Sequence, residues 1–283
     1  MVKRYSLILA QLRKLIRQPP SPGKSLAYPR LRNFILDIMA EGRRKNIIHL
    51  MFDADIVELR SRLVRYNEET GQRISLTTCI AKSLVSTIDE DRSMHAYRQG
   101  KSKLMVFDEI DLSVMIERDT LEGTLPVVSI VRAANRKSMS EMHQELKAAQ
   151  IATLGENGPM SALEKRFFEL PSLLRRLVWF FIRRDPDLFK QLAGTVGVTS
   201  IGMHTSGPAV LIPITPMTLT LAIGSTGKKI VLENGSPVER EILHLNLSAD
   251  HDIIDGAPLV RFADRFKKKI EKACELDHPR LLH

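Results

Sequence analysis

Apolar residues recur with a helical period in several stretches of the chain. In residues 76–89 they fall at Leu76, Ile80, Leu84 and Ile88, along one face of a helix. The same spacing predicts helices over residues 31–41, 56–69, 76–89, 138–151 and 258–275. Ser138 and Glu141 stand three residues apart, which is the sequence of a capping box and predicts that a helix begins at Ser138.

Other stretches alternate between apolar and polar residues, as strands with one buried face do. Residues 110–118 place Leu112, Val114 and Ile116 on one face. Strands are expected over residues 47–53, 104–107, 110–118, 125–132, 195–199, 219–224 and 242–249, the second and third joined by a tight turn. Asn234-Gly235 predicts a hairpin within residues 228–239. Strands mixed with long helices favour an α/β or α+β fold in one domain.

Residues 1–30 read as a basic, proline-rich arm. The arm is interpreted as an oligomer contact or a loosely packed extension, with a membrane-surface helix as the alternative. Residues 160–191 are expected to be helical and carry paired arginines at 175–176 and 183–184. Their aromatic residues are expected in a packed core or interface rather than in a lipid anchor: Phe167, Phe168, Trp179, Phe180 and Phe181.

Residues 191–227 contain no Asp, Glu, Lys or Arg. Their prolines and glycines do not suit a membrane-spanning helix, so buried strands are expected, without a transmembrane segment or a signal peptide. The chain has 283 residues, and its 42 Lys and Arg exceed its 33 Asp and Glu, which gives a net charge of +9. Because the basic residues are scattered and aromatics make up only 5%, specific nucleic-acid binding is not expected.

Two cysteines, Cys79 and Cys274, stand far apart, which indicates a reducing compartment and a cytoplasmic protein. No cluster has metal-ligand spacing, so no metal is expected. Neither a Gly-x-Gly-x-x-Gly nor a Walker-type loop occurs, which disfavours dinucleotide redox chemistry and nucleotide hydrolysis.

The candidate chemistry lies at the end of the last predicted strand. His251 and Asp255 are four residues apart, followed by Gly256 and a helix. A turn brings such a carboxylate back to the imidazole, and histidine is a common general base. The alternative is a polar loop in which Asp255 caps the helix.

The stretch LNLSADHDIIDGAPLVRFADRFKKKIE resembles the C-terminal end of the dihydrolipoyl acyltransferases, the catalytic domains of 2-oxoacid dehydrogenase complexes. Their shared signature is His-x-x-x-Asp-Gly, and Asp250 before the histidine is typical of the dihydrolipoyl branch. Residues 194–203 (GTVGVTSIGM), residues 123–128 with 135–138 and, more weakly, residues 32–49 resemble further family motifs in the family's order.

The resemblance implies a chloramphenicol-acetyltransferase-like fold: a two-layer sandwich with a mixed central sheet and flanking helices. It also implies a homotrimer or a higher multiple, with active sites between subunits. The expected domains are an arm over residues 1–30 and the acyltransferase domain over residues 31–283, with residues 160–191 as an extra helical segment. That segment would cover one mouth of the active-site channel, bind a partner or lie on a membrane.

Functional residues carry over by position. His251 matches the base that takes a thiol proton, and Thr199 matches the hydroxyl that stabilises the oxyanion. Asp255 matches an aspartate that holds the site together by pairing with an arginine, for which Arg32 is the candidate. The resemblance further assigns supporting roles to Asp250 and to two turn glycines, Gly202 and Gly256.

The implied substrates are coenzyme A or acyl-CoA and a dihydrolipoamide-type thiol. Because no lipoyl domain is visible in this sequence, the lipoyl group is expected on a separate protein, with dehydrogenase-complex components as partners. A small hydroxyl or amine compound is the alternative acceptor. A catalytically inactive trimeric scaffold is the alternative function, favoured by Asp252, where the family usually has arginine.

Overall fold

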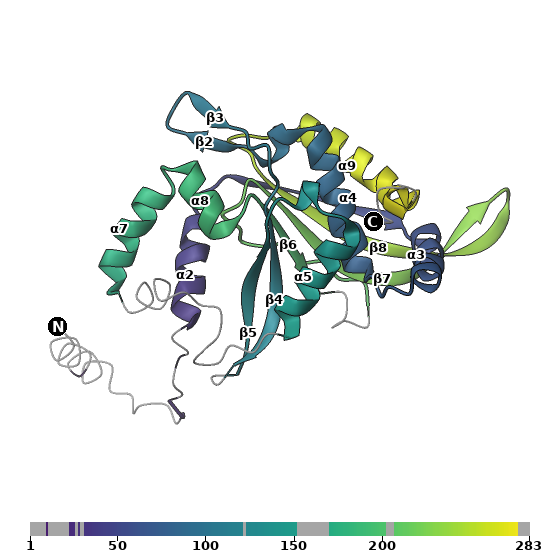
Figure 1. The fold of residues 1–283 in the computed structure, drawn as a ribbon, viewed down its shortest axis with the longest axis horizontal. Helices are drawn as coiled ribbons and strands as arrows, with labels where there is room; N and C mark the ends of the chain where they lie inside the picture. The colour runs from purple at the N-terminus through teal and green to yellow at the C-terminus, as the bar shows by residue number, and fades with distance from the viewer. Residues whose placement is uncertain are drawn as a thin grey trace.

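A computed structural model describes residues 10, 23–25, 28, 31–120, 123–151, 170–201 and 207–276. A six-stranded mixed sheet runs through them in the order β1-β8-β7-β6-β4-β5 (Figure 1). Its strands are β1 (Ile47–Asp55), β4 (Leu112–Thr120), β5 (Gly123–Val131), β6 (Val196–Ser200), β7 (Leu219–Glu233) and β8 (Ser236–Asp250). β6 pairs in parallel with β4 and β7, whereas the other pairs are antiparallel.

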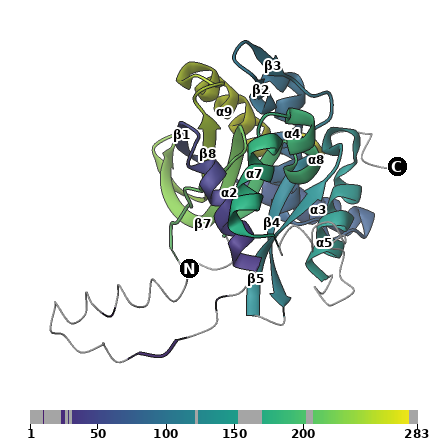
Figure 2. The ribbon, with the colours of Figure 1, turned by 90° about the vertical axis from the view of Figure 1, so that its left-hand side faces the viewer.

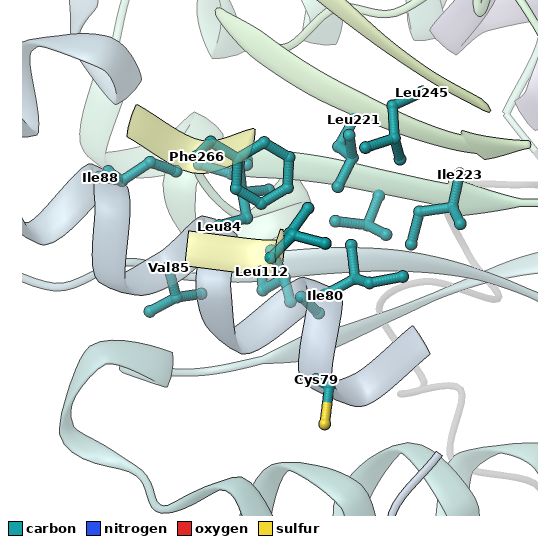
Figure 3. Close-up of a cluster of buried hydrophobic side chains, with 14 of the residues drawn as sticks. Cys79, Ile80, Leu84, Val85, Ile88, Leu112, Leu221, Ile223, Leu245 and Phe266 are labelled. Atoms are coloured by element: carbon teal, nitrogen blue, oxygen red, sulfur yellow. The ribbon is translucent and has the colours of Figure 1, made fainter. Parts of the chain in front are cut away.

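One face of the sheet is covered by a helix layer. Its helices are α3 (Val57–Thr70), α4 (Leu76–Glu90), α5 (Met139–Ile151) and α9 (Gly256–Glu271). The predicted face of α4 is in the core, since Ile80, Leu84 and Ile88 are fully buried (Figure 3). Leu221 of β7 and Phe266 of α9 belong to the same cluster. The mixed sheet and its flanking helices confirm the predicted fold class.

A smaller group of elements packs beside the sheet (Figure 2). It contains α2 (Leu31–Gly42), α7 (Ser172–Ile182), α8 (Pro186–Ala193) and the two-stranded sheet of β2 (Tyr97–Gln99) and β3 (Lys103–Met105). Trp179, Ile182 and Phe189 form its apolar centre together with Tyr97 and Met217. Three short 3-10 helices complete the described elements: η1 (Arg92–His95), η2 (Ala134–Arg136) and η3 (Cys274–Leu276).

The predicted tight turn between strands 104–107 and 110–118 is wrong. β3 pairs with β2, which the pattern did not predict, and β4 begins only at Leu112. Ile110 joins no ladder because its N–H donates to Asn135 Oδ1 at 3.1 Å and its carbonyl accepts from Ala134 N at 2.7 Å.

The strands predicted over 219–224 and 242–249 and the hairpin between them form one continuous hairpin of two 15-residue strands, β7 and β8. Its turn is the predicted Asn234-Gly235, where both residues have positive φ, 50° and 82°. A register shift between Ile223 and Thr226 interrupts the pairing at the point where the predicted strand 219–224 ends.

The helical segment predicted over residues 160–191 is divided. α7 ends at Ile182, and α8 begins at Pro186 with Asp185 as its cap, its side chain accepting from Asp187 N and Leu188 N. Residues 152–169, which include Phe167 and Phe168, lie outside the described residues, as does most of the arm. Within the described ranges, no helix has the length and apolar character needed to cross a membrane.

Candidate active site

His251 stands where β8 gives way to α9. Its N–H donates to the carbonyl of Asn46 at 2.7 Å, just before β1. The carbonyl of Asp250 accepts from Ile253 N and Ile254 N at 3.0 and 2.9 Å, which closes the turn. The backbone on both sides of the imidazole is therefore held by hydrogen bonds.

The His251 ring faces Asp255, with Nδ1 3.5 Å from Oδ1. Asp255 occupies the N-cap position of α9, but its side chain makes no capping hydrogen bond. The alternative in which this carboxylate caps the helix is therefore wrong. The His251 side chain is 46% exposed, so solvent or a second molecule can reach the imidazole.

The residues on either side of His251 are tied to the segment before β1. Asp250 is buried, and its Oδ2 accepts from Lys45 Nζ at 2.6 Å. Asn46 Nδ2 donates to Asp252 Oδ1 at 2.9 Å. Two successive residues thus hold the loop from one side. Asp252, for which the family resemblance implies an arginine, accepts this hydrogen bond from Asn46 with one carboxylate oxygen.

Thr199 lies on β6 and does not meet His251 within the chain. It pairs with Ala222, which pairs with Asn246 of β8, so Thr199 is level with a residue well before His251. At about 3.3 Å per residue, the five residues from Asn246 to His251 span about 16 Å along the strand. Two strand spacings of about 5 Å each add to that separation.

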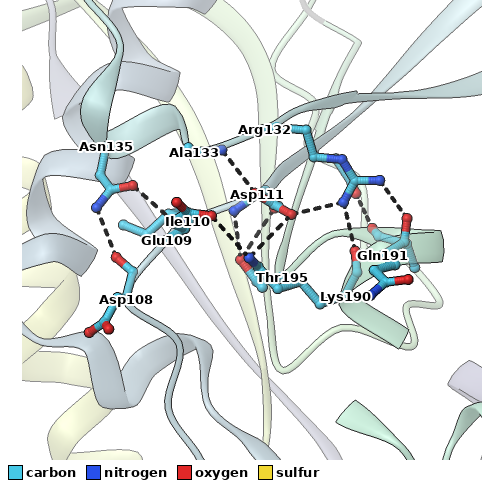
Figure 4. A network of polar contacts seen from close by, with 12 residues as sticks. Asp108, Glu109, Ile110, Asp111, Arg132, Ala133, Asn135, Lys190, Gln191 and Thr195 are labelled. Atoms are coloured by element: carbon cyan, nitrogen blue, oxygen red, sulfur yellow. Dashed lines mark hydrogen bonds and ion pairs between the residues drawn. The ribbon is translucent and has the colours of Figure 1, made fainter. Parts of the chain in front are cut away.

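A buried acidic residue, Asp111, fixes the start of β6 (Figure 4). Its carboxylate accepts from Arg132 Nη1 at 2.8 Å and from Ala133 N at 2.9 Å. Its backbone N–H donates to Thr195 Oγ1 at 3.0 Å, and its carbonyl accepts from Thr195 N at 2.7 Å. Arg132 also donates to the carbonyl oxygens of Lys190 and Gln191 in α8. This network sets the position of the strand that carries Thr199.

The structure does not give Arg32 and Gly256 the supporting roles that the sequence predicts. Arg32 is exposed near the start of α2, and no ion pair joins it to Asp255 among the described residues, where the ionic partner of Asp255 is His251. The tight turn expected at Gly256 is wrong, since this glycine is the first residue of α9, has no positive φ and has open space around a Cβ position. Gly202 lies outside the described residues.

A cavity of about 150 Å³ opens beside the histidine loop. Asp250, Asp252 and Ile253 form one side, and Trp179 of α7 and Arg183, which follows α7, belong to its lining. Further lining residues are Arg44, Lys45 and Arg98, of which Arg44 and Arg98 are exposed. The cavity therefore combines apolar residues with basic and acidic ones, since Glu41 also lines it and lies 3.4 Å from Arg44. In the described part of the chain, no group of three or more His, Cys, Asp or Glu could hold a metal ion.

Sequence reasoning missed the polar row on the sheet face opposite the helices. Asn246 and Ser248 are fully buried on β8, and Ser248 Oγ lies 2.9 Å from His49 Nδ1. Alternation places Thr199 on the same face, because Val196 and Val198 point into the core. Residues 245–248 (LNLS) alternate between leucine and polar residues, which indicates a polar face on this strand. The local pattern does not predict that His49 is the partner of Ser248.

Comparison with known proteins gives the family. The family described as 2-oxoacid dehydrogenases acyltransferase (catalytic domain) matches residues 23–165 and 189–277. The acetyltransferase component of the pyruvate dehydrogenase complex of Rickettsia conorii is 22% identical over 91% of this chain and 56% of the relative. That of Mycoplasma pneumoniae is 24% identical over 91% of this chain and 58% of the relative. The chain thus spans a little over half the length of these relatives.

Solved structures show the same fold. A probable dihydrolipoamide acetyltransferase of Listeria monocytogenes superposes with a TM-score of 0.66 at 19% identity, covering 89% of this chain and 96% of that one. The dihydrolipoamide acetyltransferase of Azotobacter vinelandii gives 0.65 at 18% identity, covering 92% and 99%. Residues 166–188, between the two matched stretches, fall inside the surplus helical segment expected from the sequence. With both stretches matched across most of its length, the chain belongs to the family of 2-oxoacid dehydrogenase acyltransferase catalytic domains.

Proposed function

We propose that this protein transfers an acyl group between coenzyme A and a dihydrolipoamide-type thiol. The observation that carries the proposal is the placement of His251, held by its backbone at the end of β8, with a half-exposed ring against Asp255. Membership of the acyltransferase family supports the reaction class. The two named acetyltransferase relatives support the choice of thiol acceptor.

In this reaction His251 Nε2 takes the proton of the attacking thiol. The thiolate adds to the thioester carbonyl and forms a tetrahedral oxyanion, to which the Thr199 hydroxyl donates a hydrogen bond. Collapse of the adduct breaks the original C–S bond, and the leaving thiolate recovers the proton from His251. Asp255, next to Nδ1, favours the tautomer in which Nε2 is free to accept a proton.

The proposed site is assembled from two copies of the chain. His251 and Thr199 are too far apart along the sheet to act on one carbonyl within a single chain. A homotrimer or higher multiple would bring His251 of one copy to Thr199 of the next. The exposed Arg44 and Arg98 at the cavity mouth suit the phosphates of coenzyme A. A lipoyl-carrying protein and other dehydrogenase-complex components are the proposed partners, and the cytoplasm is the proposed location.

A catalytically inactive scaffold of the same fold is the second candidate. Asp252 favours it, because this residue places a negative charge beside the proposed base and approaching thiolate. Its hydrogen bond from Asn46 turns one carboxylate oxygen toward β1. Transfer to a small hydroxyl or amine acceptor is the remaining alternative for the acyl acceptor.

The test measures thiol release from acetyl-, succinyl- and branched-chain acyl-CoA, with and without dihydrolipoamide. Acceptor-dependent release that disappears in His251→Ala is the expected result. Thr199→Ala is expected to lower kcat by about 10²- to 10³-fold, because it removes one oxyanion donor. Release without acceptor that is still lost in His251→Ala would indicate hydrolysis or another acceptor. No release by folded oligomeric protein would support the scaffold.

Mixing the two inactive variants tests the shared site. His251→Ala and Thr199→Ala chains are unfolded together, refolded and assayed. If each site takes one residue from each of two copies, about one site in four regains both groups and activity returns. Activity that stays at the level of the separate variants, in oligomers shown to be mixed, would contradict a site shared between copies.

A further inference from the structure

Helix α7 has an apolar face that no described element covers. Five of its large apolar side chains are exposed: Leu173 at 74%, Leu174 at 47%, Leu177 at 52%, Phe180 at 37% and Phe181 at 58%. The opposite side of the helix buries Trp179 and Ile182 in the smaller apolar cluster. α7 is therefore apolar on both sides, and packing against the protein accounts for only one of them.

The family reaction does not account for this face. α7 lies wholly within residues 166–188, which the family leaves unmatched. Figure 1 places α7 at the edge of the molecule, with α2 between it and the sheet, and Figure 2, seen from that side, has α7 toward the viewer. None of the five exposed side chains lines the cavity beside the histidine loop or belongs to the polar row that holds Thr199.

The charged residues of α7 and of the two positions that follow it are all arginines, and they divide into two pairs. Arg175 and Arg183 face inward, where they bind Asp37 Oδ2 at 2.6 Å and Glu41 Oε2 at 3.1 Å of α2. Arg176 and Arg184 are exposed and have no carboxylate partner in the described ranges. Arg184 lies over the Phe180 ring at 3.5 Å, which joins a cation to the apolar face. The outward face is thus apolar, and it carries two arginines, Arg176 and Arg184, that no described carboxylate pairs with.

The exposed leucines and phenylalanines, together with the two arginines, favour one kind of binding partner for this face over another. A second copy of the same segment, related by a two-fold axis, would set Arg176 and Arg184 against their own equivalents, and residues 172–184 contain no carboxylate to pair with them. An anionic lipid surface offers apolar depth for leucine and phenylalanine and phosphate groups for arginine, and it accepts a protruding helix without a matching groove. We propose that α7 is a membrane-contact helix that lies on anionic phospholipid bilayers through Leu173, Leu177 and Phe181.

The experiment is cosedimentation of the full chain with vesicles of phosphatidylcholine, with or without phosphatidylserine. Binding that requires phosphatidylserine and weakens with salt is expected. Leu177→Gln with Phe181→Gln should reduce binding to background. Arg176→Gln with Arg184→Gln should weaken binding to anionic vesicles about tenfold or more. The basic N-terminal residues are present in every variant, so they cannot cause the differences.

The matched control is Ile230→Gln with Leu232→Gln on the β7–β8 hairpin, where the two side chains are 73% and 77% exposed. This variant removes equally exposed apolar surface elsewhere and should bind as the parent does. Trp179, the only tryptophan, is buried on the inner side of α7, so its fluorescence reports whether the helix stays packed. Acyl transfer with soluble substrates should be unchanged in all variants.

Three outcomes would overturn the proposal. One is the absence of binding to phosphatidylserine vesicles at low salt. Another is equal loss of binding in the hairpin control, which would mean nonspecific apolar adsorption. The third is an α7 variant that still binds vesicles but changes the oligomeric state, which would assign the face to a second copy.

Discussion

Replacing Lys45, which pairs with the buried Asp250, is predicted to lower the free energy of unfolding more than replacing the lysine of any other described ion pair. The Asp250 side chain is 6% exposed and that of Lys45 is 20%, with 2.6 Å between Oδ2 and Nζ. Lys45→Met leaves a buried carboxylate with one remaining hydrogen bond, from Asp252 N at 3.2 Å. Uncompensated buried charges cost about 3–5 kcal/mol, and the partial exposure of the pair places this loss near about 3 kcal/mol.

The reverse change should cost less. In Asp250→Asn the lysine ammonium can turn toward water, and an amide remains near the Asp252 N–H, so the loss should be about 1–2 kcal/mol. The double variant Lys45→Met with Asp250→Asn should recover part of the single Lys45→Met loss, because no buried charge is left unpaired. Urea unfolding at neutral pH measures all three, with the slope m checked for constancy.

Lys228→Met is the matched control, because Lys228 binds Glu239 at 2.7 Å but both side chains are largely exposed. It should leave the urea midpoint unchanged. The reasoning would be refuted if Lys45→Met shifted the midpoint no more than this control did. It would also be refuted if the two single losses simply added in the double variant.

Three further predictions concern buried groups and the α9 terminus. Burial lowers the pKa of His95 to about 4. Between about pH 6.5 and 4 the unfolded chain therefore binds more protons than the folded chain. The free energy of unfolding should fall as the pH falls through this range, by at most about 1.4 kcal/mol per pH unit. Urea midpoints across that range should show this slope, and His95→Leu should reduce it. Burial raises the pKa of Cys79 to about 12, so alkylation at pH 8 should label it only in urea, and labelling of the native protein would contradict this. Gly256→Ala should not lower the melting temperature, because open space surrounds the new Cβ; a lower temperature would show that the glycine is needed by the fold.

Local chemistry made much of the fold predictable. The spacing of Ile80, Leu84 and Ile88 determines the buried face of α4. The capping box forms as its sequence predicts, with Ser138 N donating to Glu141 Oε2 at 2.7 Å and Glu141 N donating to Ser138 Oγ at 3.2 Å. Errors arose where tertiary pairing decided the structure. β2 and β3 have only three residues each, too few for a period to show.

The site was less predictable because its contacts join distant parts of the chain. The segment around His251 is recognisable by its residues, but its supports, Lys45 and Asn46, stand more than 200 positions away. Nothing local connects Lys45 with Asp250. For α7 the limit is different, since a helix apolar on both sides has no pattern that separates the buried Trp179 from the exposed Phe181.

The separation of Thr199 from His251 follows from the sheet register, so side-chain rearrangement does not remove it. A one-residue slip of β6 would turn Thr199 from the polar face into the core and bring its apolar neighbours out. A two-residue slip restores the face but moves the hydroxyl by only about 7 Å, less than half of the separation along the strand. Such a slip would also break the paired contacts of Asp111 with Thr195. The proposed chemistry therefore requires a second copy of the chain, and the mixing of His251→Ala with Thr199→Ala tests the register of the sheet as directly as it tests the mechanism.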